Sequence, residues 1–350
     1  MKSKTRGESK KMVMKKLLLM LVALAAVAAA PAAWAGSRSG VVTVEVDLSK
    51  QPAGKEAKLW VPYPVSDQNQ TISDVKVTGD FASSAVYTDG ATGTPILFAR
   101  WEEAAASRKL AFSFKVERQE IQMRNLSSAE PQWNKGDYAE FLKPTTLGPT
   151  DGEVQKLSAK ITKGKKTVLE KARAIYDWTC ENMYRDPATR GCGKGDVCQL
   201  LKTPGGKCTD ISSVYVALAR AAGVPAREVF GVRLGKKAEE DITGWQHCWV
   251  EFFLPGTGWV PVDPADVRKA ILVEKLQLED AKTKEYREYF FGGIDPYRVK
   301  IASGRDIVLN PRQAGAPLNT FGYPYAEVGG AALDFYDPKT FIYQIRYSEK

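Results

Sequence analysis

The stretch that decides the fold is residues 202–227, KTPGGKCTDISSVYVALARAAGVPAR. Its proline and two glycines end any preceding element, because these residues favour turns over helix and strand interiors. Apolar residues then recur at helical spacing until Gly223 and Pro225, which together form a helix stop signal. Cys208 is therefore expected at or beside the first residue of a helix. The apolar positions of that predicted helix are Ile211, Val214, Tyr215, Leu218 and Ala221.

A cysteine at a helix start has distinctive chemistry. The first backbone N–H groups of a helix have no partner inside it, and the helix dipole places partial positive charge there. Both effects favour an anion, so they lower the pKa of a thiol at this position. We interpret Cys208 as a candidate nucleophile, against the alternative of a small buried residue that opens an ordinary helix. The neighbouring Gly205 and Gly206 are expected to let a substrate approach the backbone closely.

The chain downstream supplies a base and a group to orient it. The only histidine, His247, lies in WQHCWVEFFL, and a glycine-containing turn leads from there into WVPVDP, which contains Asp263. Cysteine, histidine and aspartate in this order can act as nucleophile, general base and orienter of the base. If the two segments form a hairpin, the side chains of His247 and Asp263 share a face only when the connecting loop has an odd length or the hairpin contains a bulge. A loop that pairs Leu254 with Gly258 has such an odd length.

These motifs closely resemble the core of the transglutaminase-like superfamily, relatives of the papain-like cysteine peptidases. The resemblance covers about residues 165–268 and rests on four motifs in the same order: GGKCTD, AGVPAR, HCWVE and GWVPVDP. It implies an α+β catalytic core of the papain/transglutaminase type, in which Cys208, His247 and Asp263 take the three catalytic roles. The superfamily contains cross-linking transferases, amidases, peptidases and inactive members, so the resemblance leaves the reaction open.

The chain ahead of this core divides into three predicted segments. Residues 1–35 are typical of a secretory signal, with a basic opening, an apolar run and a small-residue cleavage site that ends at Ala35. The apolar run 17–30 is short for a membrane span, and a retained N-terminal anchor is the alternative. Residues 36–125 alternate apolar and polar positions between turns, which predicts an all-β, sandwich-like domain. A polar connector follows at 126–164.

Residues 269–350 follow the core and are too aromatic for a disordered tail. We expect this C-terminal extension to pack on the catalytic core. Within it, Tyr297, Arg298 and the segment 322–325 could line a substrate groove, although packing is the commoner role for such residues.

Four cysteines remain when Cys208 is set aside. In an exported chain they allow one or two disulfides, whose pairing stays open. A zinc site would compete for them, but their spacing lacks a C-x₂-C pair and the only histidine is already assigned, so we expect neither a metal nor a cofactor. Cys248 is expected to point away from His247, because neighbours on a strand face opposite sides. The four are Cys180, Cys192, Cys198 and Cys248.

Composition narrows the choice of partner. The chain carries a net charge of +9, but removal of residues 1–35, with six lysines, one arginine and one glutamate, leaves about +3. This modest charge argues against nucleic acid as a partner.

The predicted signal and the candidate triad together indicate a periplasmic or secreted enzyme that acts on amides of proteins or peptides. The stem peptides of peptidoglycan are the other amide-rich target of the envelope. The oligomeric state stays open.

The predicted function is that of a cysteine-dependent amide hydrolase or acyltransferase that forms a thioester. Hydrolysis is favoured over cross-linking, because an exported enzyme meets far more water than acceptor amine and the chain has no calcium-binding loop of the EF-hand type. The alternative from another class is a catalytically silent module that holds a peptide in the same cleft. The second oxyanion donor also stays open, with Trp178 and Gln199 as candidates.

Overall fold

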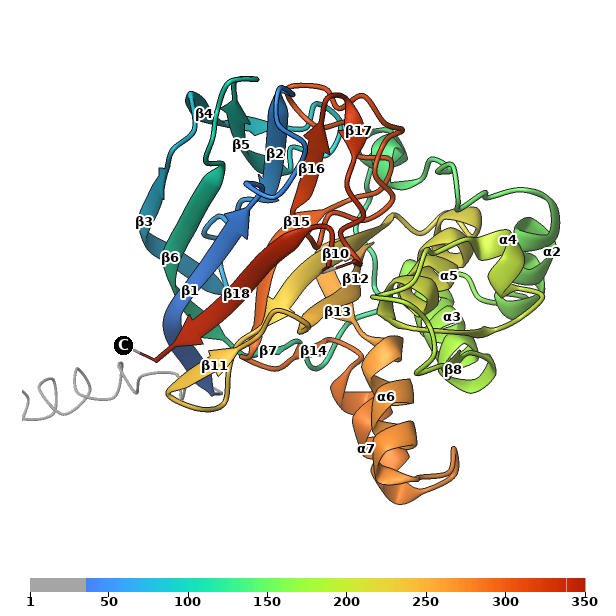
Figure 1. Cartoon of the computed structure of the whole chain (residues 1–350). Helices are drawn as coiled ribbons and strands as arrows, with labels where there is room; N and C mark the ends of the chain where they lie inside the picture. Colours follow the sequence, from blue (N-terminus) through green and yellow to red (C-terminus); the bar gives the residue numbers. More distant parts are fainter. Residues whose placement is uncertain (1–35, 338, 350) are drawn as a thin grey trace, which may run out of the picture. The chain divides into compact units, whose positions relative to one another are not determined.

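Three antiparallel sheets contain most of the strands (Figure 1). The computed structural model describes residues 36–337 and 339–349, so the predicted signal segment, its cleavage at Ala35 and the alternative anchor lie outside the described residues. Among the residues described, no helix has both the length and the apolar composition that crossing a bilayer requires. The predicted α+β class is confirmed, since antiparallel sheets and a separate group of helices make up the chain.

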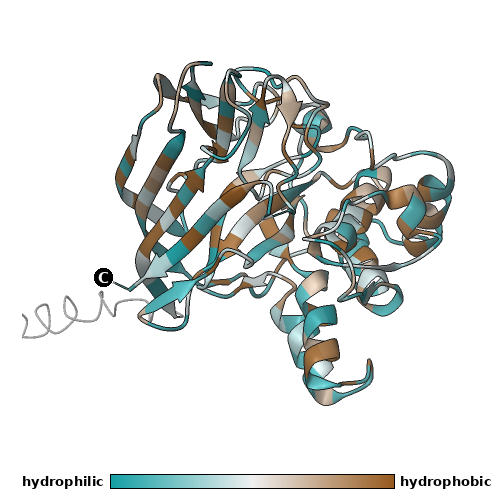
Figure 2. Cartoon of the chain, in the orientation of Figure 1, coloured by the Kyte–Doolittle hydropathy of each residue, from teal (hydrophilic) through white to brown (hydrophobic). Residues whose placement is uncertain are grey.

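The first two sheets draw most of their strands from the N-terminal third of the chain. Their strand orders are β11-β18-β1-β6-β3 and β17-β16-β2-β5-β4. In β1 every second side chain from Gly40 to Val46 is buried, as expected for a strand with one face on a core. Figure 2 shows the same alternation of hydrophobic and hydrophilic residues along the strands. The bounds are β1 Ser37–Asp47, β2 Ala57–Pro62, β3 Gln70–Gly79, β4 Ser83–Thr88, β5 Pro95–Trp101 and β6 Lys109–Gln119.

The C-terminal segment completes both of these sheets. β18 (Ile342–Ser348) pairs with β1, so the first and last strands of the described chain lie side by side (Figure 1). β16 (Tyr325–Val328) pairs with β2 and, on its other edge, with β17 (Ala331–Ala332). The C-terminal segment therefore does more than pack on the catalytic core. The domain limits at 125, 164 and 268 stay predictions from the sequence.

The third sheet, of order β13-β12-β10-β15, lies against the helices and carries part of the candidate site. Two further short pairs are antiparallel β14 with β7 and parallel β8 with β9, and the second pair contacts the helices α5 and α6. The remaining strands are β7 Ile121–Gln122, β8 Tyr184–Arg185, β9 Gly205–Gly206, β10 Ala226–Arg233, β11 Glu239–Asp241, β12 Gln246–Leu254, β13 Gly258–Val262, β14 Gly293–Ile294 and β15 Arg298–Ser303. The helices are η1 Lys135–Phe141, α2 Gly152–Ile161, α3 Val168–Asn182, α4 Val197–Leu200, α5 Cys208–Ala221, α6 Pro264–Glu274 and α7 Ala281–Tyr289.

Helix α5 is the centre of the helical part. Every residue from Cys208 to Arg220 is buried, which fits a helix that is apolar on nearly all sides. It contacts β10 and β12 of the third sheet on one side and α2, α3 and α6 on others. The helix therefore cannot shift without disturbing most of its neighbours, and its first residue is held firmly beside the sheet.

Candidate active site

The structure places Cys208 as the first residue of α5, as expected from the sequence. The carboxylate of Asp210 accepts hydrogen bonds from the backbone N–H groups of Lys207 (3.0 Å), Lys194 (3.0 Å) and Gly195 (2.8 Å). It thus joins the helix start to the loop that carries Cys192. A backbone hydrogen bond of 2.9 Å from Thr209 N to the carbonyl of Cys192 holds the same loop against the helix.

The two glycines before Cys208 are required by this packing. A Cβ atom on Gly206 would lie 2.4 Å from Cβ of Asp210, and one on Gly205 would lie 2.4 Å from the ring of Tyr184. Both distances are shorter than side chains tolerate. The sequence predicts close approach of a substrate at these glycines, whereas the structure shows close approach of the Asp210 and Tyr184 side chains.

His247 and Asp263 meet through the β12–β13 hairpin. The three-residue loop 255–257 pairs Leu254 with Gly258, which is the odd-length register expected for a hairpin that places His247 and Asp263 on one face. The Nε2 atom of His247 lies 2.7 Å from Oδ2 of Asp263, and both residues are buried. Asp263 is also the N-cap of α6, because its other carboxylate oxygen accepts from the backbone N–H of Asp266 at 2.8 Å.

A buried arginine, Arg298, stands behind this pair. Its guanidinium donates to Oδ2 of Asp263, to Oδ2 of Asp266 at 2.6 Å and to Oδ2 of Asp295 at 2.8 Å. Arg233 also donates to Asp266, at 2.6 Å. For Arg298 the structure bears out packing, the commoner of the two roles considered from the sequence, since its side chain is fully buried in this network and does not line a groove. Its neighbour Tyr297 does line the cavity described below.

Three cysteine sulfurs gather at the start of α5: those of Cys192, Cys208 and Cys248 lie within 4.8 Å of one another. The hydroxyl of Tyr323 donates to Sγ of Cys192 at 3.0 Å, and Oγ1 of Thr209 lies 3.2 Å from Sγ of Cys248. All five cysteines are free thiols, so no disulfide that the sequence allows is formed. The grouping was missed because it arises between a loop, a helix and a strand that are distant in sequence.

The charges around Cys208 favour its thiolate. Hydrogen bonds from the thiols of Cys192 and Cys248, followed by the hydrogen bond and charge of His247, lower the pKa of Cys208 well below its usual value despite burial. The pKa of Cys192 is raised, first by its hydrogen bond with Cys208 and also by burial, although its hydrogen bond with Cys248 acts in the opposite direction. The pKa of Cys248 is raised by its hydrogen bonds with both other thiols and by burial. One sulfur of the three is therefore the preferred site of negative charge.

The charges around His247 favour its imidazolium. Burial and the charge of Arg233 lower its pKa, but the carboxylates of Asp266 and Asp263 outweigh them, so the net direction is upward. A raised pKa on the histidine and a lowered pKa on the cysteine are the two conditions for a thiolate–imidazolium pair.

A cavity of about 1050 Å³ opens onto this site and is lined by Cys192, Cys208 and His247 among others. Neither Trp178 nor Gln199, the residues considered as oxyanion donors, lines it. Gln246 does, and its amide nitrogen is buried without a hydrogen-bond partner among the described residues. An unpartnered donor that belongs to the cavity of Cys208 is a candidate for the group that stabilises an oxyanion, and no local signal in the sequence marks it.

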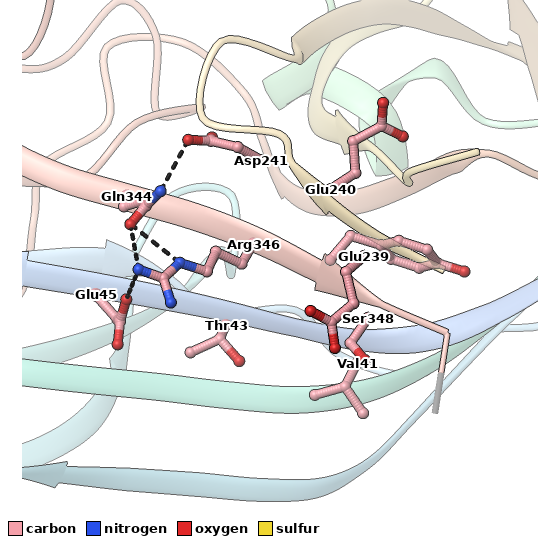
Figure 3. A pocket seen from close by; sticks show the side chains of 10 residues that line it. Val41, Thr43, Glu45, Glu239, Glu240, Asp241, Gln344, Arg346 and Ser348 are labelled. Atoms are coloured by element: carbon pink, nitrogen blue, oxygen red, sulfur yellow. Dashed lines mark hydrogen bonds and ion pairs between the residues drawn. The ribbon is translucent and has the colours of Figure 1, made fainter. Parts of the chain in front are cut away.

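A second cavity, of about 500 Å³, lies on β1, β11 and β18 and is shown in Figure 3. Its lining is mostly polar, and Arg346 donates to Gln344 at 2.6 Å and lies 3.4 Å from Glu45. It contains no cysteine or histidine.

Comparison with known proteins relates the chain to transglutaminase-like proteins. A model of the transglutaminase-like superfamily matches residues 155–264. An uncharacterized protein of Haemophilus influenzae is 39% identical over 319 residues, which is 83% of this chain and 86% of that protein. A protein-glutamine gamma-glutamyltransferase of Pseudomonas aeruginosa is 36% identical over 85 residues, 23% of this chain and 12% of that protein. The structure of a candidate cysteine protease of Cytophaga hutchinsonii has a TM-score of 0.53 at 18% identity and covers 89% of this chain and 98% of its own.

Because the chain has a single histidine, its titration can be followed by NMR without assignment. We expect the imidazole signal to titrate above 6.5, and the midpoint to fall in Asp263→Asn, because loss of a carboxylate removes attraction for the imidazolium proton. Asp74→Asn, an exposed aspartate on β3, should leave the midpoint unchanged. A wild-type midpoint at or below 6.5, or no change in Asp263→Asn, would contradict the proposed electrostatics.

Proposed function

The chain belongs to the transglutaminase-like superfamily, and we propose that it is an acyl-transfer enzyme in which Cys208 is the nucleophile, His247 the general base and acid, and Asp263 the group that orients it. One observation carries the proposal: His247 contacts Asp263 at 2.7 Å while it lines the same cavity as Cys208. The lowered pKa of the Cys208 thiol and the raised pKa of His247 support a thiolate–imidazolium pair before substrate binds.

In the proposed reaction, the Cys208 thiolate attacks an amide carbonyl. The backbone N–H at the start of α5 and the amide of Gln246 stabilise the oxyanion, and one such donor lowers a barrier by roughly 3–4 kcal/mol. His247 donates its proton to the leaving amine, which departs and leaves a thioester on Cys208. Water, deprotonated by His247, releases an acid, or a second amine releases a new amide.

Cys192 is the rival for the role of nucleophile, because its sulfur lies within 4.8 Å of that of Cys208 and it also lines the cavity. Two observations favour Cys208. It alone of the two stands at a helix start, and the pKa of Cys192 is raised rather than lowered.

We place hydrolysis ahead of transfer and take a protein or peptide amide as the substrate. Water is the acceptor in excess wherever the protein acts. The likeness to a gamma-glutamyltransferase favours transfer but covers only 23% of this chain, and the likeness to a candidate cysteine protease concerns the fold.

Export to the periplasm or medium is part of the proposal and rests on residues 1–35. A silent peptide-binding module and a peptidoglycan stem-peptide substrate are the alternatives.

An activated ester tests the proposal without knowledge of the natural substrate. With 4-nitrophenyl acetate we expect a burst of nitrophenolate and an acetyl adduct on Cys208 by mass spectrometry. Cys208→Ala should abolish the adduct and lower turnover roughly 10³-fold or more. Cys192→Ala should keep the adduct on Cys208 but react more slowly near neutral pH, because loss of the Cys192 hydrogen bond raises the pKa of Cys208. In the presence of glycinamide, acetate should exceed acetylglycinamide.

An adduct on Cys192 in the wild type would reassign the nucleophile. Absence of any adduct would favour the silent binding module. An excess of acetylglycinamide over acetate would reverse the preference for hydrolysis and leave the triad in place.

A further inference from the structure

The cavity at Cys208 has an uneven charge. Its lining contains five cations and a single carboxylate: Arg185, Lys207, Arg233, Lys236, Lys269 and Asp295. Two of the six already have partners within the site. Asp295 accepts from Arg298 at 2.8 Å, and Arg233 donates to Asp266 at 2.6 Å.

Three of the unpaired cations surround the start of α5. Arg185 on β8 pairs with Gly206 on β9. Gly206 precedes Cys208 by two residues, so Arg185 lies close to the start of α5. Lys207 is the N-cap of α5, and Lys269 is on α6, which contacts β8. We call these three residues the cation cluster.

No carboxylate of residues 36–337 or 339–349 forms an ion pair with the cation cluster. Arg185, Lys207 and Lys269 are each half-buried. Burial and the nearby charges of Arg233 and Arg185 lower the pKa of Lys269, although Asp266 acts in the opposite direction. Half-buried like charges repel, so an anion that enters the cavity would relieve the repulsion.

Six of the other lining residues are aromatic. They are Trp245, Tyr297, Tyr323, Phe335, Tyr336 and Tyr343. Flat apolar rings suit side chains and backbone of a peptide better than they suit a small inorganic anion. A cavity of about 1050 Å³ has room for several residues.

We propose that the cation cluster is a subsite for carboxylates of the substrate, so that the enzyme acts on acyl groups of acidic peptides. This inference rests on the proposed function, because the carboxylate is placed relative to an acyl group on Cys208. The cation cluster would hold a glutamate or aspartate side chain next to the reacting carbonyl while the aromatic lining holds the remainder of the peptide.

Protection of Cys208 from alkylation tests the inference. A triglutamate peptide should slow the reaction of Cys208 with iodoacetamide, and triglutamine at the same concentration should not. In Arg185→Gln/Lys269→Gln the protection should fall about fivefold or more, as expected for two charges lost near a bound carboxylate. Lys163→Gln/Lys165→Gln, which removes two exposed lysines beyond α2, is the matched control and should keep the protection.

Equal protection by triglutamate and triglutamine, or equal protection in the two double variants, would overturn the cation cluster as a carboxylate subsite. Failure of iodoacetamide to label Cys208 at all would overturn the proposed function, and the subsite with it. The two failures are therefore distinguishable in one experiment.

The thiol cluster supports a second, independent inference. Cys192 shares the cavity with Cys208, whereas Cys248 belongs to an inner strand of the third sheet and is not part of the lining. The Thr209–Cys192 backbone hydrogen bond of 2.9 Å brings the chain at Cys192 beside the residue after Cys208. Gly191 and Gly193 flank Cys192 with positive φ angles of 56° and 96°, conformations that glycine adopts readily.

We infer that Cys192 is a resolving cysteine, which forms a reversible disulfide with Cys208 and switches the enzyme off under oxidising conditions. The Cys208 thiolate attacks the disulfide of an oxidant such as oxidised glutathione and releases one glutathione thiolate. The Cys192 thiol then loses its proton to solvent, and its sulfur attacks the Cys208 sulfur of the mixed disulfide, which releases the second thiolate. Two protein thiols are oxidised and one glutathione disulfide is reduced to two thiols.

Oxidised glutathione, followed by mass spectrometry of the non-reduced protein, tests this switch. We expect a wild-type product two hydrogens lighter with a 192–208 cross-link, at least tenfold loss of esterase turnover, and full return with dithiothreitol. Cys192→Ser should instead retain glutathione on Cys208, and Cys248→Ser should still form the 192–208 link. A 208–248 link, or a persistent glutathione adduct on wild-type Cys208, would overturn the inference.

Discussion

The candidate site depends on one buried guanidinium. Arg298 is fully buried, and it holds three carboxylates in place behind His247. A buried arginine without such partners would cost several kcal/mol, and so would buried carboxylates without it. The network contains three acids, two arginines and the imidazole, so its formal charges cancel when the imidazole is protonated. Its members are Asp263, Asp266, Asp295, Arg233, Arg298 and His247.

The negative charge that faces the His247 imidazolium is that of the Cys208 thiolate at the start of α5. Cys208 is held there by a helix that is buried along its length, next to two further thiols and the imidazole. The arrangement therefore couples two environments, one that favours a cation on His247 and one that favours an anion on Cys208. The three central residues are fixed by regular elements, because Cys208 is the first residue of α5, His247 lies on β12 and Asp263 is the N-cap of α6.

The parts of the site that could be predicted are those whose signals are local in the sequence. Cys208 follows turn residues and precedes a helical pattern, and the register of the hairpin follows from the loop length. Arg298 and Cys192 could not be placed in this way. Arg298 is 35 residues from Asp263 and Cys192 is 16 from Cys208, and each meets its partner through tertiary packing. The pairing of β18 with β1 is likewise a contact between the two ends of the described chain, which periodicity cannot reveal.

The measurement that tests the central claim most directly is the pH dependence of the thiolate at Cys208. The ultraviolet absorbance of thiolate, taken as wild type minus Cys208→Ala across the pH range, reports the ionisation of this sulfur. The account predicts that the thiolate persists well below the pH of about 8.5 at which a free cysteine ionises. Thiolate absorbance that appears only at or above that pH would contradict it.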